Sequence, residues 1–411
     1  MTTPTSSNLL DLDSAHQRER LRTIASVNSG TDNLAGIETV REHVLSWLSP
    51  LADDVELREV EPRVMIDARG GQVAALTAPV SIVRFRPAAS RRVLLAAHLD
   101  TVFPIDSAFQ TISEDGDRWN GPGVADMKGG IVVMTAALEA ITSQLPADFG
   151  WTVALTGDEE VGSPSSTPVL HELATAHDVG VCVEPSLPDG SLAGERGGSA
   201  NFDLVIRGKS AHVGRNYNDG RSAIHCAAEA VGVLASLNAA EGVTVNVGKI
   251  DGGGPSNQVA DLAVVRMNVR VANAERQEAI MNDLRRMEVV LNRRDGFKAS
   301  LHGKFFSVPK PLRGGTATLF DHARVAAADV GIDLKWNTTG GVCDGNKLQA
   351  VGLPTIDTLG IVGGHLHSPH EFADVSSIAP RASLMATLML GLASGRFDWP
   401  QRLPSQLSGD A

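Results

Sequence analysis

The stretch WTVALTGDEEVGS, residues 151–163, joins an apolar run to an acidic pair, Glu159 and Glu160. The apolar run has the length and composition of a buried β-strand, and the acidic pair follows it directly. Two exposed loop glutamates would also explain the pair. Acidic side chains at the end of a buried strand are costly without a partner, however. The stretch therefore predicts a strand whose end carries functional carboxylates.

Two other apolar runs end in the same way. RRVLLAAHLD, residues 91–100, leads to His98 and Asp100, and VGVCVEPS, residues 179–186, leads to Glu184. Helical patterns lie between the strand-like runs, over residues 38–52 and 126–145. Strands that alternate with helices predict an α/β domain with a mixed, mostly parallel sheet, which binds ligands at the carboxyl ends of its strands.

The pattern changes near Gly197. Alternating strands lie over residues 199–212, 243–253 and 261–272, and two helices lie over residues 223–237 and 275–291. This sequence of elements predicts a β-α-β-β-α-β unit. The proline-containing VPKPLRGG, residues 308–315, then returns the chain to the first domain. We therefore predict a discontinuous catalytic domain, residues 1–196 and 309–411, with a ferredoxin-like α+β lid or dimerisation domain, residues 197–308, inserted into it.

Composition excludes several classes of protein. The net charge of −12 argues against a nucleic-acid partner. The sequence contains no run of about 18 apolar residues, so it predicts no transmembrane helix and no membrane partner. The start, MTTPTSSNLLDLD, lacks the basic and apolar regions of a secretion signal. Cys182, Cys226 and Cys343 are widely spaced, which favours reduced thiols and a cytoplasmic location over a disulfide framework or a cysteine zinc motif.

Three positions upstream of the acidic pair suggest a metal site. His98 and Asp100 are two residues apart and share one face of a strand, so the carboxylate can orient the imidazole as metal-bound histidines require. A solvated pair at a strand end is the alternative. Asp126 lies in the glycine-rich GPGVADMKGG, residues 121–130, where glycines permit sharp turns. A helix N-cap is the alternative for this residue.

The acidic pair suggests two separate roles. If one glutamate binds a metal, its neighbour can take a proton from the water beside that metal. Glu184 adds a further carboxylate, and His367 a further imidazole, with His365 and His370 as near rivals that spacing does not separate. These carboxylate and imidazole positions together suggest a two-metal hydrolase.

Six ordered motifs make this expectation specific. They are HLDTV (98–102), GPGVADMKGG (121–130), GDEEVGS (157–163), EPS (184–186), GKSAHVG (208–214) and HSPHEF (367–372). In this order they resemble the M20 family of zinc peptidases and deacylases, over nearly the whole chain. The family includes glutamate carboxypeptidase, acetylornithine deacetylase and succinyl-diaminopimelate desuccinylase, and the resemblance is closest to the glutamate carboxypeptidase branch.

The resemblance implies two zinc ions per subunit, with Co²⁺ or Mn²⁺ as replacements. Its metal ligands are His98, Asp126, Glu160, Glu184 and His367, with Asp126 bridging the ions, His98 and Glu184 on one of them and Glu160 and His367 on the other. Glu159 is implied as the general base, and Asp100 as the residue that orients His98. The family has a histidine four residues before the glutamate of HSPHEF, which selects His367 over its rivals. The family also implies a cis Asp126–Met127 peptide.

Residues of the inserted domain complete the predicted site. The resemblance implies that His212 polarises the scissile carbonyl, and in dimeric members this histidine reaches the partner subunit's site. Asn257 and Arg270 match contacts to a substrate carboxylate, although a surface salt bridge would also explain Arg270. Lys304 matches a further cation, and Gly341 completes the predicted substrate-binding residues. The implied protein is a homodimer that cleaves the amide bond of a dipeptide or N-acyl amino acid with a free carboxylate.

Two departures from the family bear on the substrate. PSLPDGSLAGERGG, residues 185–198, lacks a lysine of glutamate carboxypeptidases, and SNQVAD, residues 256–261, replaces the usual SNIIPA. Both weaken the case for a glutamate-specific pocket and leave the metal chemistry untouched. The alternatives are a biosynthetic deacylase for N-acetylornithine or succinyl-diaminopimelate and, more remotely, a non-catalytic metal-binding scaffold.

Overall fold

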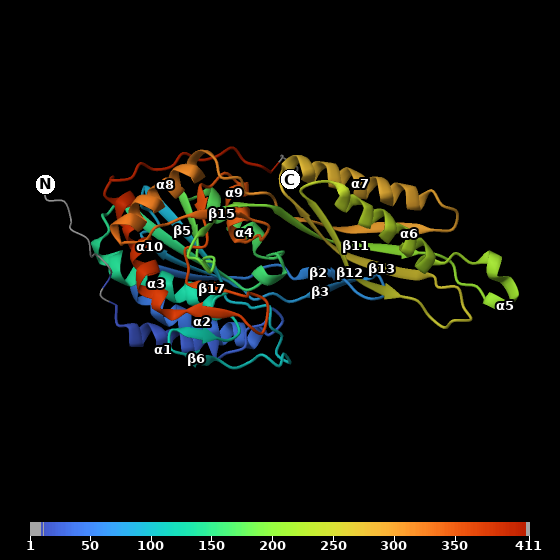
Figure 1. The fold of residues 1–411 in the computed structure, drawn as a ribbon, viewed down its shortest axis with the longest axis horizontal. Coiled ribbons are helices and arrows are strands. Elements are labelled where there is room, and N and C mark those ends of the chain that lie inside the picture. Colours follow the sequence, from blue (N-terminus) through green and yellow to red (C-terminus); the bar gives the residue numbers. More distant parts are fainter. Residues whose placement is uncertain (1–9, 11, 408–411) are drawn as a thin grey trace.

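The structure, a computed structural model, describes residue 10 and residues 12–407. Residues 1–9 and 11 carry most of the stretch on which the expectation of no secretion signal rests, and they lie outside the described residues. Figure 1 shows two parts side by side. A large part holds a central sheet between helices, and a small part, built from residues 198–307, holds a second sheet with two helices.

The large part is built on a six-stranded sheet. Its strands lie in the order β1 (Asp54–Arg58), β4 (Val80–Phe85), β8 (Phe149–Thr156), β5 (Arg91–His98), β9 (Val179–Cys182) and β16 (Thr355–Ile356). Neighbours from β8 to β16 are parallel, whereas β1 and β4 run antiparallel to their neighbours. This confirms the predicted mixed, mostly parallel sheet, and the three apolar runs of the sequence are its adjacent strands β8, β5 and β9.

Helices cover both faces of this sheet. One face packs against α1 (Ser14–Ala25), α2 (Leu34–Leu48), α3 (Lys128–Ile141), α8 (Gly314–Asp329) and α10 (Ile378–Ala393). The other face packs against α4 (Thr167–Thr175) and α9 (Asp344–Ala350). Successive side chains of a strand point to opposite faces, so Leu94 and Leu95 of β5 belong to different cores. Burial on both sides explains why these strands are continuous apolar runs.

Among the described residues, one helical stretch is long and apolar enough to cross a membrane by length and composition alone. Residues Val375–Ala393 have a mean hydropathy of 1.3 over the most apolar window, and 72% of that window is buried inside the protein. Its residues Leu384, Leu388 and Leu392 pack into the core beside α3 and α8. The stretch is therefore buried in the way that is typical of a core helix, and its core is that of the large part.

The small part has the predicted ferredoxin-like arrangement. Its elements are β11 (Gly198–Arg207), α6 (Ala223–Ser236), β12 (Val243–Gly252), β13 (Leu262–Val271), α7 (Ala274–Asn292) and β14 (Lys298–Ser307). The strands are all antiparallel, in the order β12-β13-β11-β14, and α6 and α7 cover one face. The two segments that connect the parts are joined by reciprocal backbone hydrogen bonds between Arg196 and Lys310. The domain boundaries at 196/197 and 308/309 stay a prediction.

A hairpin of the large part covers the other face of the small part's sheet. Its strands are β2 (Arg63–Ile66) and β3 (Gln72–Ala75), and both lie beside the small part in Figure 1. Ile66 packs against Val205 and Val264, and the Arg266 guanidinium donates to the Ile66 carbonyl at 2.7 Å. The sequence analysis did not predict this contact between the parts.

Smaller elements carry the loops around the carboxyl ends of the central strands. A four-stranded sheet joins β17 (Val362–Gly364), β18 (Phe372–Asp374), β7 (Arg118–Asn120) and β6 (Ser113–Asp115), and a parallel pair joins β10 (Leu192–Arg196) and β15 (Trp336–Thr339). The short helices are η1 (Ser49–Leu51), η2 (Thr142–Gln144), η3 (Glu159–Val161), α5 (Val213–Asn216), η4 (Tyr217–Asp219), η5 (Leu237–Ala239) and η6 (Val375–Ser377).

Candidate metal centre and active site

Three adjacent parallel strands deliver the first group of side chains. His98 is the last residue of β5, Glu159 and Glu160 form η3 just after β8, and Glu184 follows β9. Since parallel strands end at the same edge of a sheet, these side chains meet where ligands bind in open α/β sheets. In the sequence, the apolar runs that end in acidic residues indicated that functional side chains lie at this edge of the sheet.

Two loops from the four-stranded sheet deliver Asp126 and His367. Strands β7 and β18 pair directly, and Asp126 follows β7 while His367 precedes β18. Glu371 ties the loops together, because its carboxylate accepts hydrogen bonds from the amides of Ala125 and Asp126 at 3.0 and 3.1 Å. The Asp126–Met127 peptide is cis, as the family resemblance implied.

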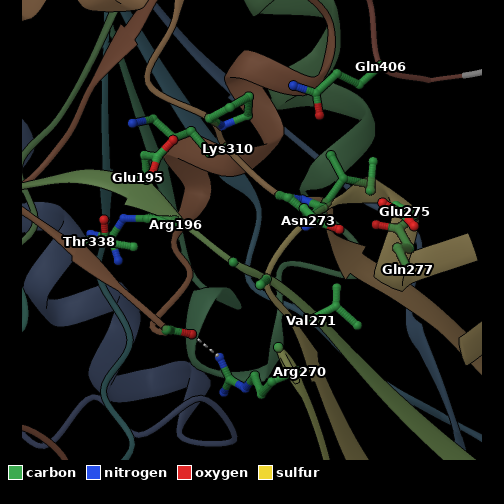
Figure 2. A pocket seen from close by; sticks show the side chains of 18 of the residues that line it. Glu195, Arg196, Arg270, Val271, Asn273, Glu275, Gln277, Lys310, Thr338 and Gln406 are labelled. Carbon is green, nitrogen blue, oxygen red and sulfur yellow. Dashed lines mark hydrogen bonds between the residues drawn. The ribbon is translucent and has the colours of Figure 1, made fainter. Parts of the chain in front are cut away.

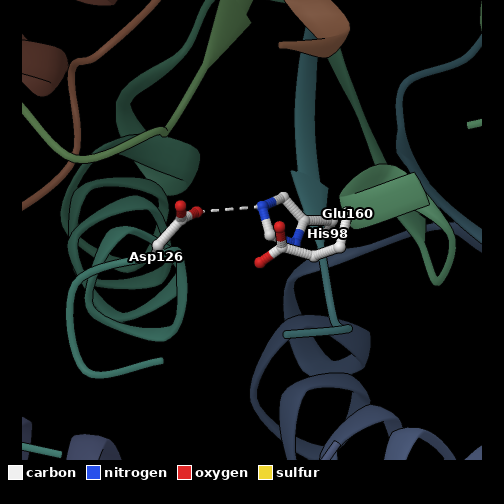
Figure 3. Close-up of side chains that lie close together, drawn as sticks. All are labelled: His98, Asp126 and Glu160. Atoms are coloured by element: carbon white, nitrogen blue, oxygen red, sulfur yellow. Dashed lines mark hydrogen bonds and ion pairs between the residues drawn. The ribbon is translucent and has the colours of Figure 1, made fainter. Parts of the chain in front are cut away.

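The Asp126 carboxylate lies between two imidazoles. Its Oδ1 is 3.1 Å from His98 Nε2, and its Oδ2 is 3.4 Å from His367 Nε2. Each imidazole has a second carboxylate nearby: Glu184 Oε1 lies 3.9 Å from His98 Nε2, and Glu160 Oε2 lies 3.1 Å from His367 Nε2. Figure 3 shows His98, Asp126 and Glu160 pointing toward one another. The five predicted ligands thus form one cluster with two imidazole–carboxylate pairs around Asp126.

Asp100 contacts both His98 and the acidic pair. His98 Nδ1 lies 2.9 Å from the Asp100 carbonyl and 3.4 Å from its carboxylate, so the opposite nitrogen, Nε2, faces the cluster. The same carboxylate accepts hydrogen bonds from the amides of Glu159 and Glu160, both at 3.2 Å, and from the Thr31 hydroxyl at 2.7 Å. Asp100 therefore contacts the backbone that carries the acidic pair as well as the imidazole that the sequence analysis paired with it.

The cluster creates a strongly negative potential. Hydrogen bonds to Asp126 and Glu160 raise the pKa of His367 to about 11. Burial raises the pKa of Glu159 well above its ordinary value, and burial followed by repulsion from Asp126 does the same for Glu184. Carboxylates that resist ionisation and imidazoles that hold protons are the signs of a site that lacks positive charge.

This donor set suits divalent cations. Ligand atoms of His98, Asp126 and Glu160 lie within 4.8 Å of one another, close enough to share an ion. Imidazole nitrogen and carboxylate oxygen are ligands of zinc, and they also accept cobalt and manganese. A bound cation would supply the charge that these side chains otherwise draw from protons. The residues present therefore fit the metals that the family resemblance implied.

The two rival histidines lie in a different place. His365 and His370 line a separate recess with Arg118, Asn120 and Phe372. His367 differs from both because its imidazole contacts Asp126 and Glu160. The geometry therefore separates three histidines that spacing in the sequence left open.

Arg270 lies on a cleft between the two parts. The cleft has a volume of about 970 Å³, and its lining includes Arg270, Glu275, Arg313, Thr338 and Gly340. Arg270 donates to the Gly340 carbonyl at 3.3 Å, the bond drawn in Figure 2. Burial lowers the pKa of Arg270, and the charge of Glu159 opposes this, which places Arg270 within electrostatic reach of the acidic pair.

The other predicted substrate contacts are divided between two places. Gly341 lies beside this cleft, and its carbonyl accepts from the buried Arg196 at 3.1 Å. Lys304 is exposed on β14, opposite Asn201 of β11. His212 and Asn257 lie together, since the Val213 amide donates to the Asn257 carbonyl at 3.0 Å. Helix α5, whose N-cap is His212, lies in Figure 1 at the end of the small part far from the central sheet. The structure therefore does not bring His212 and Asn257 to the metal centre within one chain.

The sequence analysis missed three residues beneath or beside the cluster. Glu371 belongs to the quoted HSPHEF motif, so its position was visible but its contacts were not. Asp344 and Lys347 form a buried pair at the start of α9, and the Asp344 carboxylate accepts from Ser163 beside the acidic pair. An acid and a lysine three residues apart, after a Gly-Gly pair, were the available signal.

Two comparisons of sequence agree with this geometry. Residues 94–391 match the model of peptidase family M20/M25/M40. The chain is 29% identical to carboxypeptidase G2 of Pseudomonas sp. (strain RS-16) over 74% of this chain and 75% of that protein. It is 28% identical to a succinyl-diaminopimelate desuccinylase of Maricaulis maris, over 74% of this chain and 82% of that protein.

Solved structures share the fold. A tripeptidase from Staphylococcus aureus superposes with a TM-score of 0.72 at 20% identity, over 93% of this chain and 99% of that one. A dinuclear metal-binding peptidase of the M20 family from Bacillus subtilis superposes with a TM-score of 0.65 at 15% identity, over 93% of this chain and 98% of that one.

Proposed function

The chain belongs to peptidase family M20/M25/M40, and from this premise we propose that it uses two zinc ions to cleave an amide bond in a dipeptide or N-acyl amino acid with a free carboxylate. The observation that carries the proposal is the Asp126 carboxylate, whose oxygens face two separate imidazole–carboxylate pairs. A carboxylate in that position suits a bridge between two ions.

Each pair would hold one metal. His98 and Glu184 would bind the first ion, Glu160 and His367 would bind the second, and Asp126 would contact both. When bound, the metals would polarise the amide carbonyl and make the attacking water more acidic. Asp100 supports this arrangement because it faces the non-ligating nitrogen of His98, as outer contacts of metal-bound histidines commonly do.

Glu159 is the residue we assign as general base. Its neighbour Glu160 faces His367, while the burial that raises the pKa of Glu159 makes its carboxylate a better proton acceptor. Glu159 would take a proton from the attacking water and deliver it to the leaving amine. The raised pKa suits that second step, since a carboxylic acid must give the proton up near neutral pH.

Substrate recognition would fall to the small part. Arg270 donates to the Asn268 side chain and to the Gly340 carbonyl, and it pairs with no carboxylate of the described residues. Its planar guanidinium suits a substrate carboxylate. Asn257, Lys304 and Gly341 are the further contacts we propose. His212 would stabilise the developing oxyanion from a partner subunit of a homodimer joined through residues 197–308. All three cysteines are free and buried, which favours a cytoplasmic location.

A biosynthetic deacylase is the second candidate. The chain is 28% identical to a succinyl-diaminopimelate desuccinylase and 29% identical to carboxypeptidase G2, so identity alone does not choose between the two classes. The departures at residues 185–198 and 256–261 affect the surroundings of the substrate rather than the metal ligands. The two candidates therefore share one centre and differ in the group that the amide carries.

A substrate panel tests the proposal. Zinc-loaded protein would be assayed against dipeptides, N-acetyl amino acids, N-acetylornithine and succinyl-diaminopimelate, with the Glu159→Gln variant as the control. We expect turnover of at least one carboxylate-bearing class and a loss of about 10²–10⁴-fold in the variant, which keeps its metals but cannot accept the proton. Equal rates for the two proteins would remove Glu159 as the base. Absence of turnover across the panel, with zinc bound, would favour the scaffold.

A further inference from the structure

A buried ion pair lies beneath the acidic turn, which we define as residues 157–162 with Glu159 and Glu160. Asp344 is the first residue of α9, and the Lys347 ammonium donates to its Oδ1 at 2.8 Å. The two side chains are only 5% and 2% exposed. Within the described part of the chain, no hydrogen bond or ion pair joins either residue to a proposed metal ligand, and neither residue lines the cleft, so the proposed function leaves the pair without a role.

The Asp344 carboxylate contacts both ends of the acidic turn. The Ser163 hydroxyl donates to Oδ1 at 2.5 Å, and the Thr156 hydroxyl donates to Oδ2 at 3.3 Å. Thr156 is the last residue of β8, and Ser163 is the residue that follows the turn. One carboxylate therefore fixes the positions at which the acidic turn leaves the strand and rejoins the chain.

Charge makes this choice of residue unusual. Asp344 adds a buried carboxylate to a region that already contains Asp126, Glu159, Glu160 and Glu184. A buried carboxylate without a partner is strongly destabilising, and Lys347 offsets that cost here. Burial would lower the pKa of Lys347, but Asp344 raises it above its ordinary value, so the lysine stays charged. The protein therefore buries a charged pair at a place where burial of neutral side chains would cost less free energy.

The turn is also held from β5. The Asp100 carboxylate accepts the amides of Glu159 and Glu160, which lie between Thr156 and Ser163. Asp100 fixes the middle of the turn, and Asp344 fixes its two ends. A backbone held at these points leaves little freedom for the two glutamate side chains, and catalytic groups need placement to a fraction of an ångström.

We propose that Asp344, balanced by Lys347, is a positioning residue that holds the acidic turn so that Glu160 meets its metal and Glu159 meets the attacking water. The proposal rests on the proposed function for the identity of the groups it positions. The ordinary alternative is a core ion pair that only stabilises α9, and the two accounts predict different responses to neutral replacements.

Three variants separate these accounts. Asp344→Ala with Lys347→Met removes the ion pair and both contacts to the turn. Asp344→Asn with Lys347→Met also removes the charges but keeps an amide oxygen that accepts from Ser163 and an amide group that reaches Thr156. Ser163→Ala deletes a single hydroxyl and keeps the ion pair, so it reports on the contact even where a double variant folds poorly.

Zinc affinity and steady-state kinetics are the measurements. We expect the Ala/Met variant to bind its weaker zinc about 10–10²-fold less tightly in a chelator competition, the range seen when outer contacts of metal ligands are removed. Its kcat per zinc-loaded site should fall by a similar factor while KM changes less than about twofold. The Asn/Met variant should recover most of both losses, and Ser163→Ala should show a smaller loss of the same kind.

Three outcomes would overturn the proposal. They are unchanged zinc affinity and kcat in Ser163→Ala, equal losses in the Asn/Met and Ala/Met variants, or a change in KM that accounts for the loss in kcat/KM. Zinc affinity needs no substrate, so it tests the positioning role even if the proposed substrate class is wrong. A wild-type protein that binds zinc but turns over none of the panel would count against the proposed function, and the zinc affinities of the variants would still decide the positioning role.

Discussion

At the scale of single residues, Asp126 is the reason we propose two ions for the centre rather than one. Its two oxygens point at different imidazoles, and each imidazole has its own second carboxylate. Removing a ligand from one pair should therefore leave the other pair largely intact. The three histidines at 365, 367 and 370 allow this to be tested within a single loop.

His367→Ala should reduce the zinc content from two ions to about one per chain and abolish most activity. The reason is that His367 contacts Asp126 and Glu160, whereas His365 and His370 line a separate recess. Elemental analysis of the three alanine variants checks this. His365→Ala and His370→Ala serve as controls and should keep both ions. If His365→Ala lost the most zinc, the assignment of His367 would be wrong.

His177 should make the protein less stable in acid. Burial lowers the pKa of His177 to about 4. The buried ring is neutral, and it donates from Nδ1 to the Leu173 carbonyl and accepts at Nε2 from the Thr152 hydroxyl. The unfolded chain binds this proton near its ordinary pKa of 6.5, so stability is lost as pH falls from about 6.5 to 4. The loss for this group approaches about 3 kcal/mol at the acidic end.

Urea unfolding of zinc-loaded protein at pH 7.0 and pH 4.5 measures this contribution. His177→Gln should lose about 2–3 kcal/mol less than the wild type on acidification, since it has no proton to gain. His16→Gln, on the exposed face of α1, is the matched control and should follow the wild type. A His177→Gln variant with the same acid sensitivity as the wild type would show that another group dominates.

At the scale of elements, the acidic turn depends on close contact with the small part. Gly162 has a φ of +94°, and a Cβ at this position would lie 2.7 Å from the Phe306 ring of β14. Gly162→Ala should therefore displace the turn and lower kcat by about 10-fold or more, because a small misplacement of catalytic groups is costly. Steady-state kinetics on zinc-loaded protein check this expectation.

Two controls isolate the contact with Phe306. Gly331→Ala has a similar positive φ of +77° but open space around its Cβ, so it should cost stability without changing kcat. Gly162→Ala combined with Phe306→Ala removes the clash and should recover part of the lost rate. A double variant no faster than Gly162→Ala alone would assign the effect to backbone strain instead.

Sequence reasoning found the elements whose signals are local. The apolar runs of β5, β8 and β9 are buried on both faces, so each was recognisable by itself. The β2–β3 hairpin was not predicted, because Ile66 packs against Val205 and Val264, which lie far from it in the sequence. Asp344 and Lys347 were missed for the same reason, since short polar helices such as α9 are usually exposed. Contacts between segments that are distant in the sequence cannot be read from the pattern of one segment alone.

At the scale of the whole molecule, the predicted substrate contacts lie at two ends of one sheet. Arg270 lies near the end of β13 that adjoins the large part, and Gly340 and Gly341 lie beside it. His212 and Asn257 lie beyond the far ends of β11 and β12. If His212 acts at the centre as proposed, a single chain in this arrangement lacks that residue at its site. Either the small part closes over its own centre, or a second copy supplies His212.

The β2–β3 hairpin bears on that choice. It packs against the open face of the small part's sheet, and Arg207 donates to the carbonyls of Arg69 and Gly70 at 3.1 Å. Closure of the small part would have to carry the hairpin along or break these contacts. A partner subunit needs no such rearrangement, and for this reason we favour a dimer that shares its sites.

Mixing two inactive variants decides between the arrangements. His212→Ala removes the proposed oxyanion contact, which should lower kcat by about 10²–10³-fold with both metals kept, and Glu159→Gln removes the base. If sites are shared in a twofold dimer, each mixed dimer has one site with an intact Glu159 and an intact partner His212. Equimolar exchange should then restore about a quarter of wild-type activity. Mixing Glu159→Gln with His367→Ala is the control and should restore none, since both residues lie in the same chain's half of the site. No recovery with His212→Ala, after labelled subunits are seen to exchange, would establish closure within one chain as the better account.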